Sequence, residues 1–443
     1  LSTLGLLGAH IVVVWPLDGL VAVRQLLGNP ILLDEALLIA PPCLGLAALW
    51  WLYHPLDQAF RRRLQLRHIE DGVVPPSPPG RARYVLQQLR TQLLMLLVPL
   101  LGILTLTEVA TTLLIPESSR TGNSLAEEGI RVGAAVLVLA LAPLSMRFTL
   151  DLRRLPDGPL RDQLIGVCRR HGIRVRQLLV WHTSGTMANA AVLGFLGPLR
   201  YVMLTDLLLE ALEPDEVEAV MAHEIGHLRR HHMPWMIAVL LGILFFWSTV
   251  VWLATFGLEF AVGPWVWTSA AVTWSGAGLS LAAALLTFGW VSRRFERQAD
   301  TFAVQHLSRP PDADAAATPI ITGTAAATMV TTLDKIARLN FVEPERPSWR
   351  HGSIGWRQRY LVTLVGRPLD QLPIDRLVGR IKAAAAILVG VGLLWTVAEI
   401  AVTAGRPEPQ PDPEALDWRE TLETWGRNLD AMDATAAEGN HWP

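Results

Sequence analysis

Long apolar stretches alternate with polar segments along most of this chain. A helix that crosses a bilayer needs roughly 17–25 mainly apolar residues. Two stretches meet this requirement cleanly, residues 236–258 and 260–292. Five more are counted with them: residues 1–17, 36–56, 91–115, 132–146 and 383–405. The pattern therefore predicts a polytopic α-helical membrane protein with about seven spans.

The composition supports a membrane protein and excludes other classes. Hydrophobic residues make up 51% of the 443 residues and charged residues only 18%, which is too apolar for a soluble protein of this length. This composition makes a lipid bilayer an expected partner. The net charge is −2, so nucleic acid is not an expected partner. Cys43 and Cys168 lie far apart and predict neither a disulfide framework nor a cysteine metal site.

The distribution of arginine predicts the orientation of the spans. Residues 57–90, 147–230 and 293–382 are rich in arginine, whereas the loops at 116–129 and 259–264 are acidic or nearly uncharged. Because basic loops stay on the cytoplasmic side, the arginine-rich segments are expected in the cytoplasm and the C-terminal tail outside. Nearly all basic residues are arginine, which favours a source with a GC-rich genome. Because such a composition suggests a bacterium, the inner membrane of a bacterium is the expected location.

Two polar regions between the spans carry the candidate chemistry. In residues 149–232, "RYVMLTD" predicts a strand, and "EPDEVEAVMAHEIGHLRRHH" predicts a helix with Pro214 in its first turn. In residues 293–381, "DADAAATPIITGTAAAT" is typical of a mobile loop. The histidine-rich helix is the strongest candidate for a site.

The pattern HEIGH in that helix predicts a metal site. Residues four apart share a helix face, so His223 and His227 can hold one zinc ion. Glu224, one position further round, is placed to act as a general base toward a water at that ion. The alternative is an amphipathic helix whose side chains face lipid headgroups. Four neighbours fit that alternative and are not expected to bind metal: Arg229, Arg230, His231 and His232.

The third zinc ligand is predicted by elimination. A catalytic zinc ion has three protein ligands and leaves its fourth position to water. Between His227 and Asp300 the only acidic residues are Glu259 and Glu296. Glu259 follows one span, and a helix of about twenty residues is roughly 30 Å long, so it lies on the far side of the membrane. Glu296 follows two spans and returns to the side of His227.

Asp300 lies four residues after Glu296 and therefore shares its helix face. A carboxylate at this position can hydrogen-bond the outer nitrogen of a ligand histidine. The alternative for Glu296 is an ion pair with neighbouring arginines on a helix at the membrane surface.

These motifs resemble a known family, the membrane-embedded zinc proteases that include the CaaX prenyl endopeptidases and the bacterial HtpX heat-shock proteases. "VMAHEIGH" and, two spans later, "SRRFERQAD" are similar to the HExxH and ExxxD pair of that family. "NAAVLG" (residues 189–194) resembles its Asn-Ala segment. "HGSIGWR" (residues 351–357) resembles its His-Pro-Ser-x-x-x-Arg motif, with Gly352 in place of proline. The specific similarity covers residues 150–365.

The resemblance implies a mixed α/β catalytic domain of the gluzincin type with one zinc ion per chain. It implies that Glu224 is the catalytic base and that His351 and Arg357 contact the substrate or the developing oxyanion; the alternative is a histidine at a helix start and a surface arginine. The resemblance also implies that residues 189–194 form an edge strand that binds the substrate backbone, which would serve a protease of broad specificity. The alternative for these residues is an ordinary loop. The predicted site comprises the metal ligands His223, His227 and Glu296, the catalytic residues Glu224, Asp300, His351 and Arg357, and the substrate-binding residues Asn189, Ala190 and Ala191.

The expected organisation follows the spans. The chain is predicted to divide into N-terminal transmembrane helices (1–148), the first part of the protease domain with the HExxH helix (149–235), a transmembrane hairpin (236–292), the second part of the protease domain with the third ligand (293–381), a C-terminal span (382–405) and an acidic tail (406–443).

The expected function is that of an integral-membrane zinc metalloendopeptidase that faces the cytoplasm and cleaves membrane-associated or unfolded polypeptides. The alternative is a non-catalytic membrane scaffold or transporter with a vestigial zinc site. The intact Glu224 disfavours that alternative, because a purely structural site needs no base. An intramembrane protease of the site-two type is excluded, because "EPDEVEA" before HEIGH is too charged to lie in lipid. The sequence predicts no oligomeric state.

Overall fold

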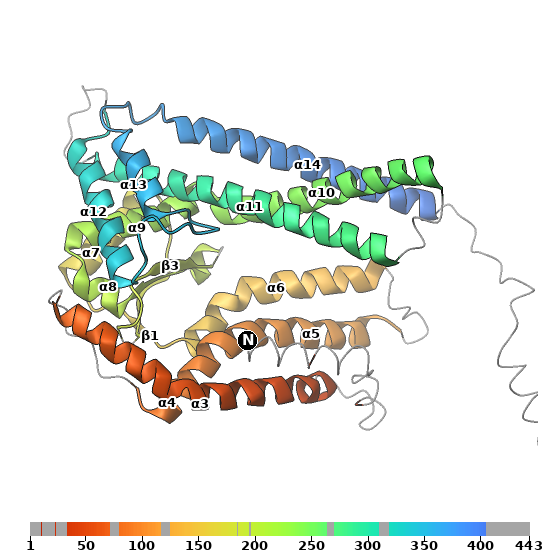
Figure 1. Ribbon diagram of the computed structural model, residues 1–443, viewed down its shortest axis with the longest axis horizontal. Coiled ribbons are helices and arrows are strands. Elements are labelled where there is room, and N and C mark those ends of the chain that lie inside the picture. The colour runs from red at the N-terminus through yellow and green to blue at the C-terminus, as the bar shows by residue number, and fades with distance from the viewer. Residues whose placement is uncertain are drawn as a thin grey trace, which may run out of the picture. The chain divides into compact units, whose positions relative to one another are not determined.

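A computed structural model describes most of the chain and divides it into two compact units, Leu1–Ala386 and Ile387–Pro443 (Figure 1). The predicted first span and the acidic tail lie outside the described residues. The described residues are 33–70, 79–116, 125–183, 185–194, 196–263, 270–309 and 319–404, together with the single residues His10 and Val23.

Long helices dominate the described chain (Figure 1). Helix α5 packs against α6, and α10 packs against α11. The long helices and their short connections are α3 (Leu33–Glu70), α4 (Arg81–Gln88), the π-helical turn η1 (Leu89–Leu94), α5 (Met95–Leu114), α6 (Leu125–Thr149), α10 (His232–Val262), α11 (Ala270–Leu307) and α14 (Pro373–Ala404).

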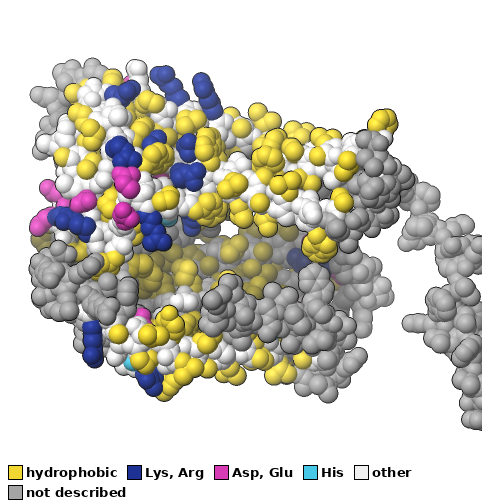
Figure 2. Space-filling view, viewed as in Figure 1, with side chains coloured by type: hydrophobic (Ala, Val, Ile, Leu, Met, Phe, Trp, Pro, Cys, Tyr) yellow, Lys and Arg dark blue, Asp and Glu magenta, His cyan; other side chains and the backbone are white. Residues whose placement is uncertain are grey.

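Several of these helices are long and apolar enough to cross a membrane. Large apolar side chains remain on their surfaces, such as Leu113, which is 78% exposed, and Leu286, which is 70% exposed. Figure 2 shows hydrophobic side chains along α10 and α11, whereas charged side chains gather at the end that carries α12 and α13. The protein is therefore an integral membrane protein. Six of the seven predicted spans have a counterpart: Ala36–Ala59, Arg81–Leu114, Ala126–Arg147, His232–Leu258, Trp274–Leu307 and Pro373–Ala398.

The predicted span at 260–292 begins at the wrong residue. Residues 260–262 still belong to α10, and α11 begins only at Ala270. Gly263 adopts a φ of 110°, a conformation that glycine tolerates and other residues rarely adopt. Apolar residues on both sides of this glycine hid the break between the two helices.

A small mixed sheet lies between α6 and the HExxH helix in the sequence. Its strands β1 (Leu152–Arg154), β2 (Gln177–Trp181), β3 (Ala190–Leu193) and β4 (Tyr201–Thr205) lie in the order β1-β2-β4-β3. Strand β4 is fully buried and parallel to β2, whereas the outer pairs are antiparallel. The predicted strand in "RYVMLTD" is therefore confirmed, and β3 is an edge strand. Helices α7 (Pro159–Arg170) and α8 (Asp206–Ala211) complete this part of the fold.

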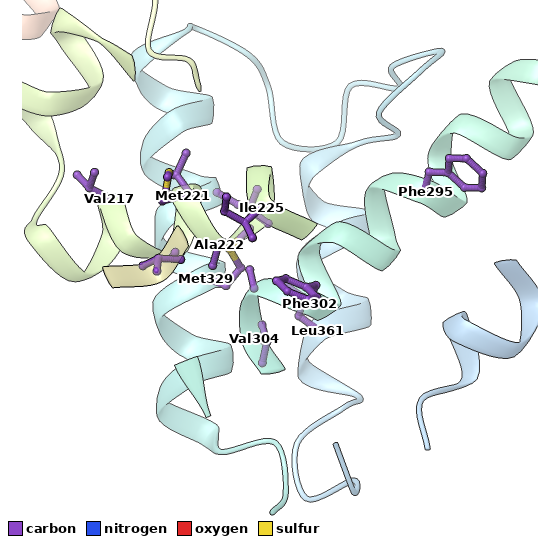
Figure 3. Close-up of a cluster of buried hydrophobic side chains, with 14 of the residues drawn as sticks. Val217, Met221, Ala222, Ile225, Phe295, Phe302, Val304, Met329 and Leu361 are labelled. Carbon is purple, nitrogen blue, oxygen red and sulfur yellow. The ribbon is translucent and has the colours of Figure 1, made fainter. Parts of the chain in front are cut away.

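The HExxH helix α9 (Pro214–Arg229) is held by an apolar cluster on one face. Val217, Met221 and Ile225 are spaced four apart and buried, and Figure 3 shows them packed with side chains from three other helices. Those helices are α11, α12 (Gly323–Leu339) and α13 (Ile354–Val362). Gly226 lets α9 approach α11 closely, because a Cβ there would lie 3.1 Å from Phe302 Cβ.

The alanine- and threonine-rich segment is not a loop throughout. Helix α12 begins at Gly323, and the side chain of Thr322 caps it by accepting a hydrogen bond of 3.2 Å from the Ala325 amide. Alanine favours helix formation. Ala325 and Ala326 are buried, and their small side chains allow α12 to pack closely. The prediction of a mobile loop is wrong for residues 323–328, and residues 312–318 lie outside the described residues.

Candidate metal centre and active site

The start of α9 fixes the direction of the HExxH helix. Glu213 and Glu216 form a capping box, in which the Glu213 amide donates to Glu216 Oε2 at 3.0 Å. Lys335 of α12 contacts the same carboxylate at 2.8 Å. With its apolar face buried, α9 turns the opposite face toward a cavity of about 650 Å³ lined by His223, Glu224 and His227.

The two histidines of HExxH and Glu296 converge on one point. His223 Nε2 and His227 Nε2 are 3.2 Å apart. Glu296 Oε2 lies 3.8 Å from His223 Nε2, and its Oε1 lies 3.7 Å from His227 Nε2. Of the described residues, these form the one cluster of histidine, cysteine and acidic side chains with metal-site spacing. The hairpin of α10 and α11 returns the chain to α9, as the span count predicts.

The donor set fits a zinc ion. His223 Nδ1 lies 2.9 Å from Asp300 Oδ1, although its N–H is not aligned as in a regular hydrogen bond. Because that carboxylate accepts hydrogen bonds, the imidazole proton belongs on Nδ1 and Nε2 presents a lone pair. A lone pair that faces another imidazole nitrogen and a carboxylate is stabilised by a cation, and two histidines with one carboxylate are a zinc set.

The enclosure of the site changes the acidity of two groups on α9. Glu224 lines the cavity, and burial raises the pKa of its carboxyl group to about 7. Burial, together with the neighbouring His223, lowers the pKa of His227 to about 4. A base with a pKa near neutrality suits proton transfer, and a neutral imidazole suits metal ligation.

Arg357 is buried beside the metal site and contributes to the lining of the cavity. Its Nε and Nη2 donate to the two carboxylate oxygens of Asp300 at 2.7 and 2.6 Å. Its Nη1 is 3.8 Å from Glu296 Oε2. Asp300 is fully buried and Arg357 is 7% exposed. This geometry favours a positioning role for Arg357 through Asp300.

His351 lies at the exposed rim of the cavity. Its side chain is 51% exposed, and Nδ1 lies 3.1 Å from Glu296 Oε2. Arg293 of α11 holds the preceding loop by donating to the Trp349 carbonyl at 2.8 Å. Gly352 has a φ of 76°, which proline cannot adopt. The departure from the His-Pro-Ser pattern is therefore matched by a backbone conformation particular to glycine.

The predicted substrate strand lines the same cavity. Asn189, Ala190 and Ala191 all contribute to its wall, and so does Val192. The Thr205 amide donates to the Asn189 carbonyl at 3.0 Å, and Ala190 pairs with Leu204. Because antiparallel pairs alternate, the backbone groups of Ala190 and Val192 point away from β4. The sequence missed Val192, which lies within the quoted "NAAVLG" segment.

The prediction that His232 faces lipid headgroups is wrong. His232 is 2% exposed, and its Nδ1 lies 2.9 Å from His227 Nδ1. His231 adopts a φ of 55°, and this turn between α9 and α10 folds His232 back onto the HExxH helix. Its other nitrogen meets Gln298 of α11 at 2.8 Å. Neither residue carried a sequence signal apart from its proximity to a ligand.

Comparison with known proteins agrees with the motifs. Residues 157–351 match the family model described as peptidase family M48. The chain is 29% identical over 180 residues to the CAAX prenyl protease 1 homolog of Arabidopsis thaliana, covering 37% of this chain and 40% of that protein. It is 28% identical over 132 residues to the protease HtpX homolog of Thermoplasma acidophilum, covering 25% of this chain and 40% of that protein. The family resemblance is therefore confirmed for this region.

The solved structure of S. mikatae Ste24p is also similar. It aligns with a TM-score of 0.44 and 16% sequence identity, covering 78% of this chain and 81% of that chain.

Proposed function

We propose that this chain is a zinc-dependent endopeptidase of the membrane, with one zinc ion held by His223, His227 and Glu296. The observation that carries the proposal is the position of Glu224, which lines the cavity on the same helix as two of the ligands. A non-catalytic zinc site would not need this carboxyl group. The match to a peptidase family over residues 157–351 supports the same activity.

The mechanism assigns separate tasks to the residues of the cavity. When bound, zinc polarises the scissile carbonyl and lowers the pKa of water toward about 7. Glu224 accepts a proton from the attacking water and later donates one to the leaving amine. Asp300 orients His223, and Arg357 fixes Asp300. His351, at the rim, is placed to contact the substrate.

The proposed substrates are extended polypeptides, either unfolded or membrane-associated. Among the described residues no strand pairs with the outer side of β3, and β3 lines the cavity, so substrate can be bound through its backbone as an additional strand. Part of the cavity lining is apolar, because Met329, Leu333 and Ile336 of α12 contribute to it. This favours apolar side chains next to the cleaved bond. The distribution of arginine supports a site on the cytoplasmic side of a bacterial inner membrane.

Val192→Pro should weaken substrate binding without removing zinc. Proline deletes the outward N–H of an edge strand but spares the pairing with β4. Because one hydrogen bond contributes roughly 0.5–1.5 kcal/mol, we expect KM to rise about three- to tenfold. Steady-state cleavage of a fluorogenic peptide measures this change. Val192→Ala keeps the N–H and serves as the control; an equal rise in KM for both variants would refute backbone recognition.

Incubation of the detergent-purified chain with an unfolded test protein tests the proposed activity. Fragments should form with the zinc-loaded protein, disappear after treatment with a chelator and return when zinc is added. A scaffold or transporter with a vestigial site would bind zinc and produce no fragments under any of these conditions.

A further inference from the structure

A chain of hydrogen-bonded side chains extends from His227 to the start of α14. His227 Nδ1 lies 2.9 Å from His232 Nδ1, and His232 Nε2 lies 2.8 Å from Gln298 Oε1. Gln298 Nε2 donates to Asp375 Oδ1 at 2.6 Å. Arg230 contacts the other oxygen of Asp375 at 3.3 Å. All five residues belong to the first compact unit.

Only one set of proton positions satisfies every link in this chain. Asp375, paired with Arg230, accepts hydrogen bonds only, so the amide nitrogen of Gln298 must face it. The amide oxygen then faces His232, so His232 Nε2 carries a proton and donates. In a neutral imidazole the other nitrogen accepts, and His227 Nδ1 must therefore donate to it. His227 is left with an unprotonated Nε2, the nitrogen beside His223 and Glu296.

We propose that Gln298 and His232 transmit the polarity of Asp375 to His227, and that this relay fixes the tautomer and orientation in which His227 binds zinc. The inference rests on the zinc site of the proposed function. Asp375, Gln298 and His232 are positioning residues, because each acts on the zinc site through His227. The relay does for His227 what Asp300 does for His223, but over three hydrogen bonds instead of one direct contact of 2.9 Å.

The surroundings of the relay hold its members in place. The ring of His232 stacks on Phe295, with 4.7 Å between ring centroids and 21° between planes. Lys382 of α14 donates to the Arg230 carbonyl at 2.6 Å. Gln298 is 4% exposed and His232 is 2% exposed, so the hydrogen bond between these two side chains is buried. The relay thereby joins α9, α10, α11 and α14 at the metal site.

Gln298→Leu should weaken zinc binding about tenfold to 100-fold, the usual effect of losing an outer hydrogen-bond partner of a metal ligand. The zinc dissociation constant of the full chain in detergent is measured by competition with a chromophoric chelator. Gln305→Leu is the matched control, because Gln305 lies on the same helix and donates to the Leu369 carbonyl at 2.5 Å. That variant should keep the wild-type dissociation constant.

Two substitutions of Asp375 distinguish the effect of its hydrogen-bond acceptor from the effect of its negative charge. Asp375→Asn keeps an oxygen that can accept from Gln298, and its zinc affinity should lie close to the wild type. Asp375→Leu removes the acceptor and should weaken zinc binding about as much as Gln298→Leu. A role limited to stabilising the start of α14 would instead lower the melting temperature of Asp375→Leu and leave its zinc affinity unchanged, which would overturn the proposal.

The double variant Gln298→Leu/His232→Phe tests whether the relay acts as a unit. Phenylalanine at position 232 preserves the stacking on Phe295. The double variant should have about the same zinc dissociation constant as whichever single variant, Gln298→Leu or His232→Phe, binds zinc more weakly. Independent, additive losses would contradict a relay. Failure of the relay is distinct from failure of the zinc site: in the first case wild type and Gln298→Leu bind zinc equally, and in the second the wild type binds none.

Discussion

Glu224→Gln should bind zinc like the wild type and lose between about 100-fold and 10,000-fold of its peptide hydrolysis, the range that general acid–base catalysis contributes. The substitution keeps the volume and the hydrogen-bonding oxygen of the side chain but removes its ability to accept a proton from water. His223, His227 and Glu296 are unchanged, so the metal set stays complete. Cleavage of an unfolded test protein and zinc content are measured on the same sample.

The matched control for this variant is Asp215→Asn, which changes an exposed acid in the first turn of the same helix. It should retain both zinc and activity. Loss of zinc from Glu224→Gln would mean that Glu224 belongs to the ligand set. Full activity with full zinc content would exclude Glu224 as the base and return the search to another proton acceptor.

Arg357→Leu should cause the largest loss of stability among single substitutions at the site. Arg357 makes a bidentate ion pair with Asp300, and both side chains are buried. Removal of one partner leaves a buried charge unpaired, which costs roughly 3–5 kcal/mol. Thermal unfolding in detergent, followed by circular dichroism, should show a clear fall in the melting temperature.

Two further variants separate stability from metal binding at this pair. The double variant Arg357→Leu/Asp300→Leu removes both charges and should recover much of the lost stability, but it should bind zinc weakly because His223 loses its partner. Arg359 lies two residues after Arg357 on the same helix and forms an exposed ion pair with Glu345. Arg359→Leu should therefore leave the melting temperature almost unchanged. An equal effect of Arg357→Leu and Arg359→Leu would contradict a buried structural pair.

The sequence was sufficient wherever the structure depends on local pattern. The spans follow from stretches of apolar residues, and the antiparallel hairpin of α10 and α11 brings Glu296 to the side of His223 and His227. HExxH is itself a local signal, because residues four apart share a helix face. Strand β4 and the start of α9 were predicted for the same reason, from an apolar run and from Pro214.

The contacts that the sequence could not predict depend on tertiary packing. His232 turns inward because His231 takes a left-handed conformation, which no pattern of residue types required. Gln298 and Asp375 meet because α11 and α14 lie side by side at that point, although they are far apart in the chain. The small residues before Met329 resembled a mobile loop, and only their burial distinguishes a packed helix.

The zinc content of the purified wild type and of Glu296→Gln tests the central claim most directly. Glu296 comes from a helix two spans after HExxH, and the amide of glutamine keeps its shape but is a much poorer zinc ligand than a carboxylate. The wild type should hold one zinc ion per chain after dialysis, and Glu296→Gln should lose most of it while remaining folded. One tightly held zinc ion in both proteins would contradict the three-ligand site on which the proposed peptidase depends.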